Sequence, residues 1–252
     1  MPATPLSHRP PTAPPGPGET TGRGPSPREG TAAALLALQG LLLFVPLTVL
    51  GAAIDWPASL DDPAAVALPR LLENEGAVRA GYLAYLLYSV LFLPVAVWTA
   101  RALRVDLGSP VVQAALGFAV ASVVARCVGI IRWLDAMPAL AGAYDSAPDD
   151  ATRTAVTVQY EALNAYGGSI GELLGVSLFA ALWLVLLLSA ARGLTPRWLV
   201  LAGFVAAGLL ALPLVELAGY DAGPLVTVGT TALQLWFLAA AVVLLRRSRA
   251  RS

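Results

Sequence analysis

The sequence contains 252 residues, of which 57% are apolar and 13% are charged, and its formal net charge is zero. Soluble globular proteins usually contain about 25% charged residues, so this composition indicates membrane-spanning helices. The single cysteine, Cys127, and the single histidine, His8, exclude an intrachain disulfide, bis-histidine haem ligation and an HExxH zinc motif, and they argue against a Ser-His-Asp triad. We therefore expect no metal ion and no cofactor.

Residues 1–30 are rich in proline, glycine, serine and threonine, which predicts a disordered tail. The first apolar run covers residues 32–54. It is longer than the apolar core of a signal peptide, which has about 7 to 15 residues. We therefore interpret this run as a retained membrane span.

Further apolar runs predict five more spans of the length that a bilayer requires. They cover residues 80–100, 110–133, 168–190, 197–217 and 224–245. Together with the first run they predict an all-α, six-helix transmembrane domain over residues 31–246, followed by a basic tail over 247–252. The two long connections, 55–79 and 134–167, show partial helical periodicity, and we expect them to form short helices along the membrane surface.

The arginines are distributed unevenly between the two sides of this predicted bundle. Eleven of the sixteen fall in the tails and the two short connections, on one side: Arg9, Arg23, Arg28, Arg101, Arg104, Arg192, Arg197, Arg246, Arg247, Arg249 and Arg251. Most acidic residues fall in the segments on the other side. By the positive-inside rule both termini lie in the cytoplasm, which predicts a multi-pass protein of the plasma membrane.

Charged residues within the spans gather in the half that faces away from the cytoplasm. At a rise of about 1.5 Å per residue, Arg126 and Glu172 lie at similar depths on neighbouring spans, and we predict an ion pair between them, with Arg132 and Glu216 completing a network. Other polar side chains at this level are Tyr82, Tyr85, Tyr88, Thr227, Thr230 and Thr231. The Arg126–Glu172 pair fits either helix–helix packing or a ligand site that opens outward.

Several of these residues also have an ordinary structural interpretation. Arg132, Trp133 and Asp135 stand at the outer boundary, where arginine and aromatic side chains commonly anchor a helix, and Arg132 and Asp135 have the i, i+3 spacing of a helical ion pair. Glu216 stands at a similar boundary. For these residues we favour anchoring, and for the tyrosines we favour helix packing over ligand binding.

The stretch "LNAYGGSIGELLG", residues 163–175, leads into the fourth span. Gly171 and Gly175 have the small-xxx-small spacing that permits close approach of two helices. Asn164 and Tyr166 precede a glycine pair that can redirect the chain. These residues place Glu172 on a tightly packed segment and join the candidate ligand pocket.

The order of these features resembles the bacterial membrane protein family named domain of unknown function 4386. The family typically shows a His/Tyr–Gly–x–x–Ile–Gly approach to a span, a loop ending in Pro-(Arg/Lys), a glycine-containing span and a final "LWL"-like helix. In this sequence those places are taken by Tyr166, Gly167, Ile170, Gly171, Pro196, Arg197, Gly203 and "LQLWFL" at 233–238. The resemblance covers residues 80–245 and implies a six-helix integral membrane protein.

Three functions are compatible with this pattern. A non-catalytic membrane protein that binds a small molecule or a membrane protein partner agrees best with the polar cluster. A transporter would need an internal repeat and polar groups at both depths, and neither is evident. An intramembrane enzyme is disfavoured because no GxSxG, GxGD, HExxH or paired intramembrane aspartates occur. The lipid bilayer is the expected surrounding, and no feature indicates nucleic-acid binding.

Overall fold

The computed structural model describes residues 27–220, 222–223 and 225–250, and the regular structure in these residues is all helical. The elements in chain order are α1 (Pro27–Leu42), α2 (Phe44–Ile54), the 3₁₀-helix η1 (Ala58–Asp61), α3 (Ala64–Glu73), α4 (Glu75–Ala102), α5 (Pro110–Leu134), α6 (Ala136–Asp145), α7 (Asp150–Gly168), the π-helix η2 (Ser169–Phe179), α8 (Ala180–Ala190), α9 (Arg197–Ala211), the 3₁₀-helix η3 (Leu212–Ala218) and α10 (Leu225–Arg249).

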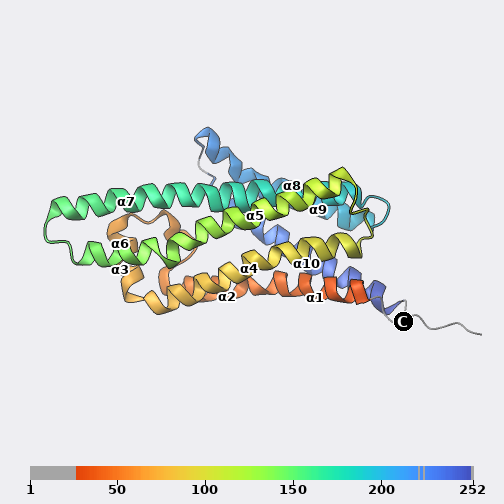
Figure 1. The fold of residues 1–252 in the computed structure, drawn as a ribbon, viewed down its shortest axis with the longest axis horizontal. Coiled ribbons are helices and arrows are strands. Elements are labelled where there is room, and N and C mark those ends of the chain that lie inside the picture. Colours follow the sequence, from red (N-terminus) through yellow and green to blue (C-terminus); the bar gives the residue numbers. More distant parts are fainter. Residues whose placement is uncertain (1–26, 221, 224, 251–252) are drawn as a thin grey trace, which may run out of the picture.

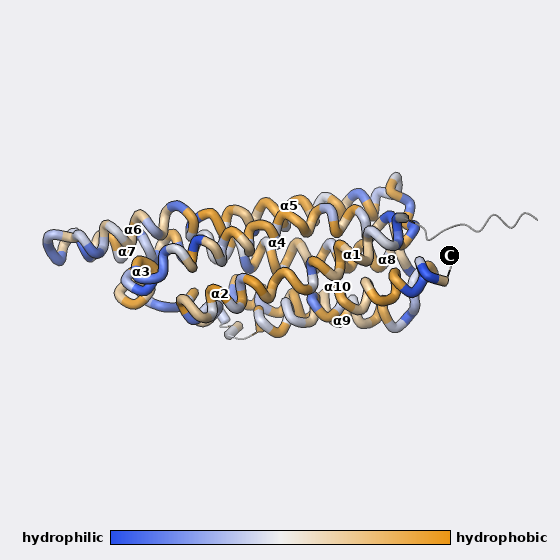
Figure 2. Tube along the Cα trace, turned by 90° about the horizontal axis from the view of Figure 1, so that it is seen from below, coloured by the Kyte–Doolittle hydropathy of each residue, from blue (hydrophilic) through white to orange (hydrophobic). Residues whose placement is uncertain are grey.

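These elements form six helices that are long and apolar enough to cross a membrane, which confirms the predicted number of spans in the described part of the chain. Their bounds are Arg28–Ile54, Glu75–Ala102, Pro110–Asp145, Asp150–Ala190, Arg197–Ala218 and Leu225–Arg249. Figure 2 shows that the middle of the bundle is hydrophobic and that hydrophilic residues gather at its two ends. The beginning of α1 and the end of α10 lie at the same end of the bundle (Figure 1).

The chain ends differ in extent from the prediction. Residues 1–26 of the predicted tail lie outside the described residues, and α1 already begins at Pro27, inside that tail. At the other end, α10 continues to Arg249, so the first part of the predicted basic tail is helical. A buried acidic side chain accounts for the earlier start, because Glu29 pairs with Arg104 at 3.5 Å.

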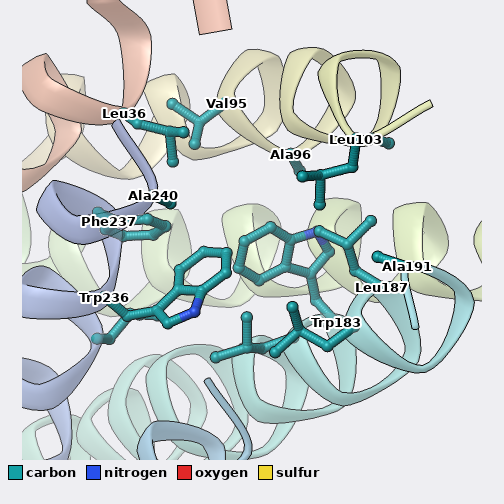
Figure 3. Packing of buried hydrophobic residues seen from close by; sticks show 14 of the residues in the cluster. Leu36, Val95, Ala96, Leu103, Trp183, Leu187, Ala191, Trp236, Phe237 and Ala240 are labelled. Carbon is teal, nitrogen blue, oxygen red and sulfur yellow. The ribbon is translucent and has the colours of Figure 1, made fainter. Parts of the chain in front are cut away.

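In the half of the bundle that contains the beginning of α1 and the end of α10, a group of aromatic residues fills the space between the helices. We call Phe92, Trp183, Trp236 and Phe237 the tryptophan core. The Trp183 ring meets Phe92 edge-on at 4.8 Å and Trp236 at 6.2 Å, and aliphatic side chains surround them (Figure 3). The indole nitrogen of Trp236 donates a hydrogen bond to the Leu199 carbonyl at 3.1 Å. This half is therefore closely packed.

In the opposite half, α6 and α7 extend beyond the other spanning helices (Figure 1). The sequence predicted short helices lying along the membrane surface here, whereas the structure continues the third and fourth spans with α6 and α7, which run along the bundle axis. These helices are held by a second apolar core that α3, α6 and α7 share, with Leu68, Met137 and Tyr160 buried in it. The third and fourth spanning helices therefore continue through the polar residues of α6 and α7.

The turn between α6 and α7 ends at a helix cap. The Oδ1 atom of Asp149 accepts a hydrogen bond of 2.7 Å from the backbone N–H of Thr152, which satisfies one of the free donors at the start of α7. The same hydrogen bond lowers the pKa of the Asp149 carboxyl below its ordinary value. The cap gives α7 a defined beginning outside the bundle.

Candidate functional site

A cavity of about 590 Å³ lies in the half of the bundle opposite the tryptophan core. Its walls come from α2, α4, α5, η2, η3 and α10, and from the loop that contains η1. Its polar lining comprises Asp61, Tyr82, Tyr85, Tyr88, Arg126, Arg132, Glu172, Glu216, Thr227, Thr230, Thr231 and Gln234. Polar side chains from five separate spans therefore face a common space.

A close contact between α5 and η2 positions the two walls of the cavity that carry Arg126 and Glu172. A Cβ atom on Gly129 would lie 2.8 Å from the Gly171 Cα, and one on Gly175 would lie 3.0 Å from the backbone nitrogen of Arg126. Because glycine has no side chain, the two helix backbones can touch at these points. Ser122 adds a hydrogen bond of 2.6 Å from its hydroxyl to the Gly175 carbonyl.

The η2 segment is a π-helix, which sequence periodicity did not predict. A π-helix makes i→i+5 hydrogen bonds and frequently occurs at functional sites. In this chain it covers Ser169–Phe179 and contains Glu172. The sequence feature that accompanies it is the glycine density of "GGSIGELLG", because glycine tolerates the backbone approach and the altered winding.

Glu172 forms an ion pair with Arg132, at 3.8 Å between Oε1 and Nη2. The sequence predicted Arg126 as its partner and Asp135 as a partner of Arg132, and both predicted pairings differ from the one observed. Glycine explains the difference, because a Cβ on Gly167 would lie 2.6 Å from Nη1 of Arg132. The Arg132 side chain lies over the bare backbone of Gly167 and reaches Glu172, whereas Asp135 is exposed at the junction of α5 and α6 and does not line the cavity.

This pairing also changes the interpretation of Arg132. Its side chain is 7% exposed, so it does not extend to the interface as an anchoring arginine would. Its guanidinium lies 5.7 Å from the centre of the Trp133 ring. Arg132 is therefore part of the cavity wall.

Arg126 is the most deeply buried charge at the cavity, with 2% of its surface exposed. Its guanidinium lies 4.8 Å from the centre of the Phe92 ring and 5.9 Å from that of Tyr88, within the range of cation–π attraction. Its buried Nε and Nη2 atoms have no hydrogen-bond partner among the described residues. These two atoms form one edge of the guanidinium, which is the edge that binds a carboxylate or phosphate side by side.

Aromatic residues from three elements form the wall next to these arginines. Tyr82 stacks on Trp133 with ring centres 5.2 Å apart, Tyr85 stacks on Tyr88 at 5.9 Å, and Trp56 meets Tyr85 edge-on at 5.5 Å. The tyrosine row therefore does pack against other aromatic rings, as the sequence favoured, and it also lines the cavity.

Two glutamines fix the position of Tyr88. Gln234 donates a hydrogen bond of 2.6 Å to the Tyr88 hydroxyl, and Gln39 donates one of 3.2 Å to the Tyr88 carbonyl. The side-chain oxygens of both glutamines are buried and have no hydrogen-bond partner within the part of the chain that the structure describes. Tyr88 and Gln234 line the end of the cavity that is nearest to the tryptophan core.

The remaining predicted residues have different places. Asn164 does not line the cavity but donates a hydrogen bond of 2.7 Å to the Leu60 carbonyl, which fastens the loop of η1 at the cavity wall. Tyr166 is exposed and lies outside the lining. Glu216, on η3, lines the cavity and is exposed, as is Asp61.

The charged residues of the cavity lining favour an anionic group at the most buried part of the cavity, next to Arg126. Arg132 and Glu172 neutralise each other, Asp61 and Glu216 are the exposed members, and the buried Arg126 has no carboxylate partner among the described residues. Within the described residues, His, Cys, Asp and Glu nowhere form a group of three or more that could hold a metal ion. The arrangement can bind an anion through an arginine surrounded by aromatic rings.

Six apolar helices around a cavity with a polar lining define a multi-pass membrane protein. The chain belongs to the family described as Domain of unknown function (DUF4386), whose family model matches residues 33–246. The resemblance seen from Tyr166 to the "LQLWFL" helix is thereby confirmed, and the match extends it to the first span. No curated protein and no solved structure matches the sequence.

Proposed function

We propose that this protein is a non-catalytic, multi-pass protein of the plasma membrane that binds a small molecule carrying an anionic group in the cavity beside Arg126. The observation that carries the proposal is the burial of Arg126, a residue of the cavity wall, together with its two donor atoms that have no hydrogen-bond partner among the described residues. A buried charge without a partner is costly. A bound anion would supply the missing hydrogen bonds and the opposite charge.

The proposed orientation places both termini in the cytoplasm and the cavity in the half that faces away from it. The short connections after α4 and α8 lie at the same end of the bundle as the beginning of α1 and the end of α10 (Figure 1). Arg101, Arg104, Arg192 and Arg197 belong to that end, as do the arginines of the last turn of α10. The positive-inside rule assigns such an end to the cytoplasm.

The packing of the bundle supports binding rather than transport. A transport path needs access to the binding site from both sides of the membrane. Between this cavity and the cytoplasmic end stands the tryptophan core, in which Trp183 and Phe237 are fully buried. The cavity therefore serves as a binding site that communicates with one half of the membrane.

The test measures the melting temperature of the purified protein with matched pairs of compounds, namely carboxylates with their amides and alkyl phosphates with their alcohols. A ligand that binds the folded state at about 100 times its Kd stabilises that state by about 2.7 kcal/mol. We expect the anionic member of at least one pair to raise the melting temperature and the uncharged member to have little effect.

The matched variants are Arg126→Gln and Arg79→Gln. Arg79 is an exposed arginine outside the cavity that pairs with Glu75 on α4 at 3.3 Å, so its replacement controls for the loss of one positive charge. Stabilisation by the anion should disappear in Arg126→Gln and persist in Arg79→Gln. Binding that is indifferent to charge, or that survives Arg126→Gln, would overturn the proposal.

A further inference from the structure

The first span has two packing partners, α10 and α4, in one half of the bundle and keeps only α4 in the other. It is interrupted at Leu43, between α1 and α2, and Pro46 follows in the first turn of α2, where its missing N–H cannot bond to the preceding turn. Below the interruption α1 packs on both α10 and α4, with Gly40 against Leu238 of α10, whereas above it α2 keeps the contact with α4, with Leu50 against Gly81, and loses the close contact with α10. The two segments thus leave room between α2 and the first half of α10, at the level of the cavity.

Apolar residues form the cavity wall at this position. Phe44 and Leu47 of α2 and Leu235 of α10 all line the cavity. The same residues are 54%, 38% and 62% exposed on the outside of the bundle. Because the outside of a membrane-spanning helix faces lipid, the apolar part of the cavity wall continues into the lipid-facing surface of the protein. We call these three residues the lateral rim.

The lateral rim and Arg126 stand at comparable distances from the ends of their helices. Arg126 stands eight residues before the end of α5, about 12 Å at the helical rise. Phe44 stands ten residues before the end of α2, about 15 Å by the same rise. Leu47 stands seven residues before the end of α2, so the rim spans the level of Arg126 by this measure. Because the rim and Arg126 line the same cavity, an amphiphile in that leaflet would have its charge at the arginine and its chain at the rim.

We infer that the ligand of this cavity is an anionic amphiphile with a single alkyl chain, which enters from the bilayer between α2 and α10. The inference rests on the proposed function, because it assigns the anionic group to Arg126. The aromatic and apolar lining and the volume of about 590 Å³ match a pocket that encloses one chain rather than a two-chain lipid. The exposed rim lets the end of a longer chain remain in the bilayer.

The experiment uses the full chain in nanodiscs of uncharged phosphatidylcholine, with empty nanodiscs to subtract partition into lipid. Equilibrium binding is measured for three probes: dodecanoate, butyrate and dodecanol. They provide charge with a chain, charge without a chain, and a chain without charge. We expect dodecanoate to bind at least tenfold more tightly than either of the others.

Two pairs of variants separate the charge from the rim. Arg126→Gln should weaken dodecanoate binding at least tenfold, and Arg126→Lys, which keeps the charge, should weaken it less. Leu235→Ser should weaken dodecanoate binding several-fold and leave butyrate binding unchanged. Leu201→Ser is the matched control, because Leu201 is an equally exposed leucine on α9 outside the cavity, and it should change neither.

The outcomes distinguish this inference from the proposed function. If butyrate and dodecanoate bind equally well and the binding of both depends on Arg126, the inference that the ligand has an alkyl chain is wrong, whereas the proposed binding of an anion is supported. If Leu235→Ser and Leu201→Ser changed dodecanoate binding equally, the inference that the alkyl chain contacts the lateral rim would be wrong. If dodecanoate binds as tightly to Arg126→Gln and to Arg126→Lys as to the unmodified chain, both the inference and the proposed function fail.

Discussion

In the half of the bundle near the chain ends, Trp183 fills the space between α4, α8 and α10, whereas in the opposite half the space between α4, α5 and α10 is a cavity of about 590 Å³. Both halves are built from the same spanning helices. They differ in the side chains that face inward, which are aromatic and aliphatic near Trp183, whereas charged, amide and hydroxyl side chains join the apolar ones around Arg126. Close packing needs apolar surfaces that fit together, and a ring of arginine, glutamine and tyrosine side chains leaves space that a ligand can use.

Removal of the central ring of the packed half should have the largest effect on stability. Trp183→Ala leaves a cavity among fully buried neighbours, and we expect it to lower the free energy of unfolding by about 3–5 kcal/mol, measured by titration with SDS in mixed micelles. Trp198→Ala is the control, because Trp198 is exposed on α9, and its effect should stay within about 0.5 kcal/mol. Equal effects of the two variants would show that the tryptophan core is not closely packed.

The glycine contact of the cavity half should be the next most sensitive point. A Cβ on Gly129 would collide with the Gly171 backbone, so we expect Gly129→Ala to destabilise the protein by about 1–3 kcal/mol and to separate η2 from α5. Gly117, on the same helix, faces open space, and Gly117→Ala should stabilise the protein by up to about 1 kcal/mol through helix propensity. A similar sign for both substitutions, in the same SDS titration, would contradict the close contact.

The smallest expected effect concerns the charges at the cavity. A double-mutant cycle of Arg132→Gln and Glu172→Gln should give a coupling energy of about 0.5–2 kcal/mol, kept modest because Glu172 is 32% exposed. The corresponding cycle of Arg126→Gln and Glu172→Gln should give a coupling near zero, since the structure pairs Glu172 with Arg132. A larger coupling for Arg126 would restore the pair that the sequence predicted.

Much of the architecture follows from hydropathy, because an apolar run of about 20 residues has few stable conformations in a bilayer other than a helix. The six runs give six helices, and the first and fifth end within one residue of the predicted position. The third and fourth helices extend well past their apolar runs, to Asp145 and back to Asp150. Hydropathy could not show this, because contacts with α3 rather than lipid stabilise α6 and α7.

The candidate site shows the same division. Counting residues along helices placed Arg126 and Glu172 at one depth, and the structure has both at a single cavity. The depth of a residue in the membrane does not determine which side chain it pairs with. Glu172 pairs with Arg132 because the Arg132 side chain passes over Gly167. Phe44, Leu47 and Leu235 carried no sequence signal, since a leucine at the edge of an opening looks like any lipid-facing leucine.

The sequence by itself determined that this protein is a bundle of six membrane-spanning helices in which the charged residues inside the predicted spans gather in one half, because the cost of exposing polar groups to lipid acts on each residue separately. The tertiary structure decided that α2 departs from α10, that η2 touches α5, and that two donor atoms of Arg126, beside a cavity, have no hydrogen-bond partner among the described residues. These features depend on which helix faces meet. That choice is made by the packing of glycines, prolines and aromatic rings from distant parts of the chain, which no single stretch of sequence contains.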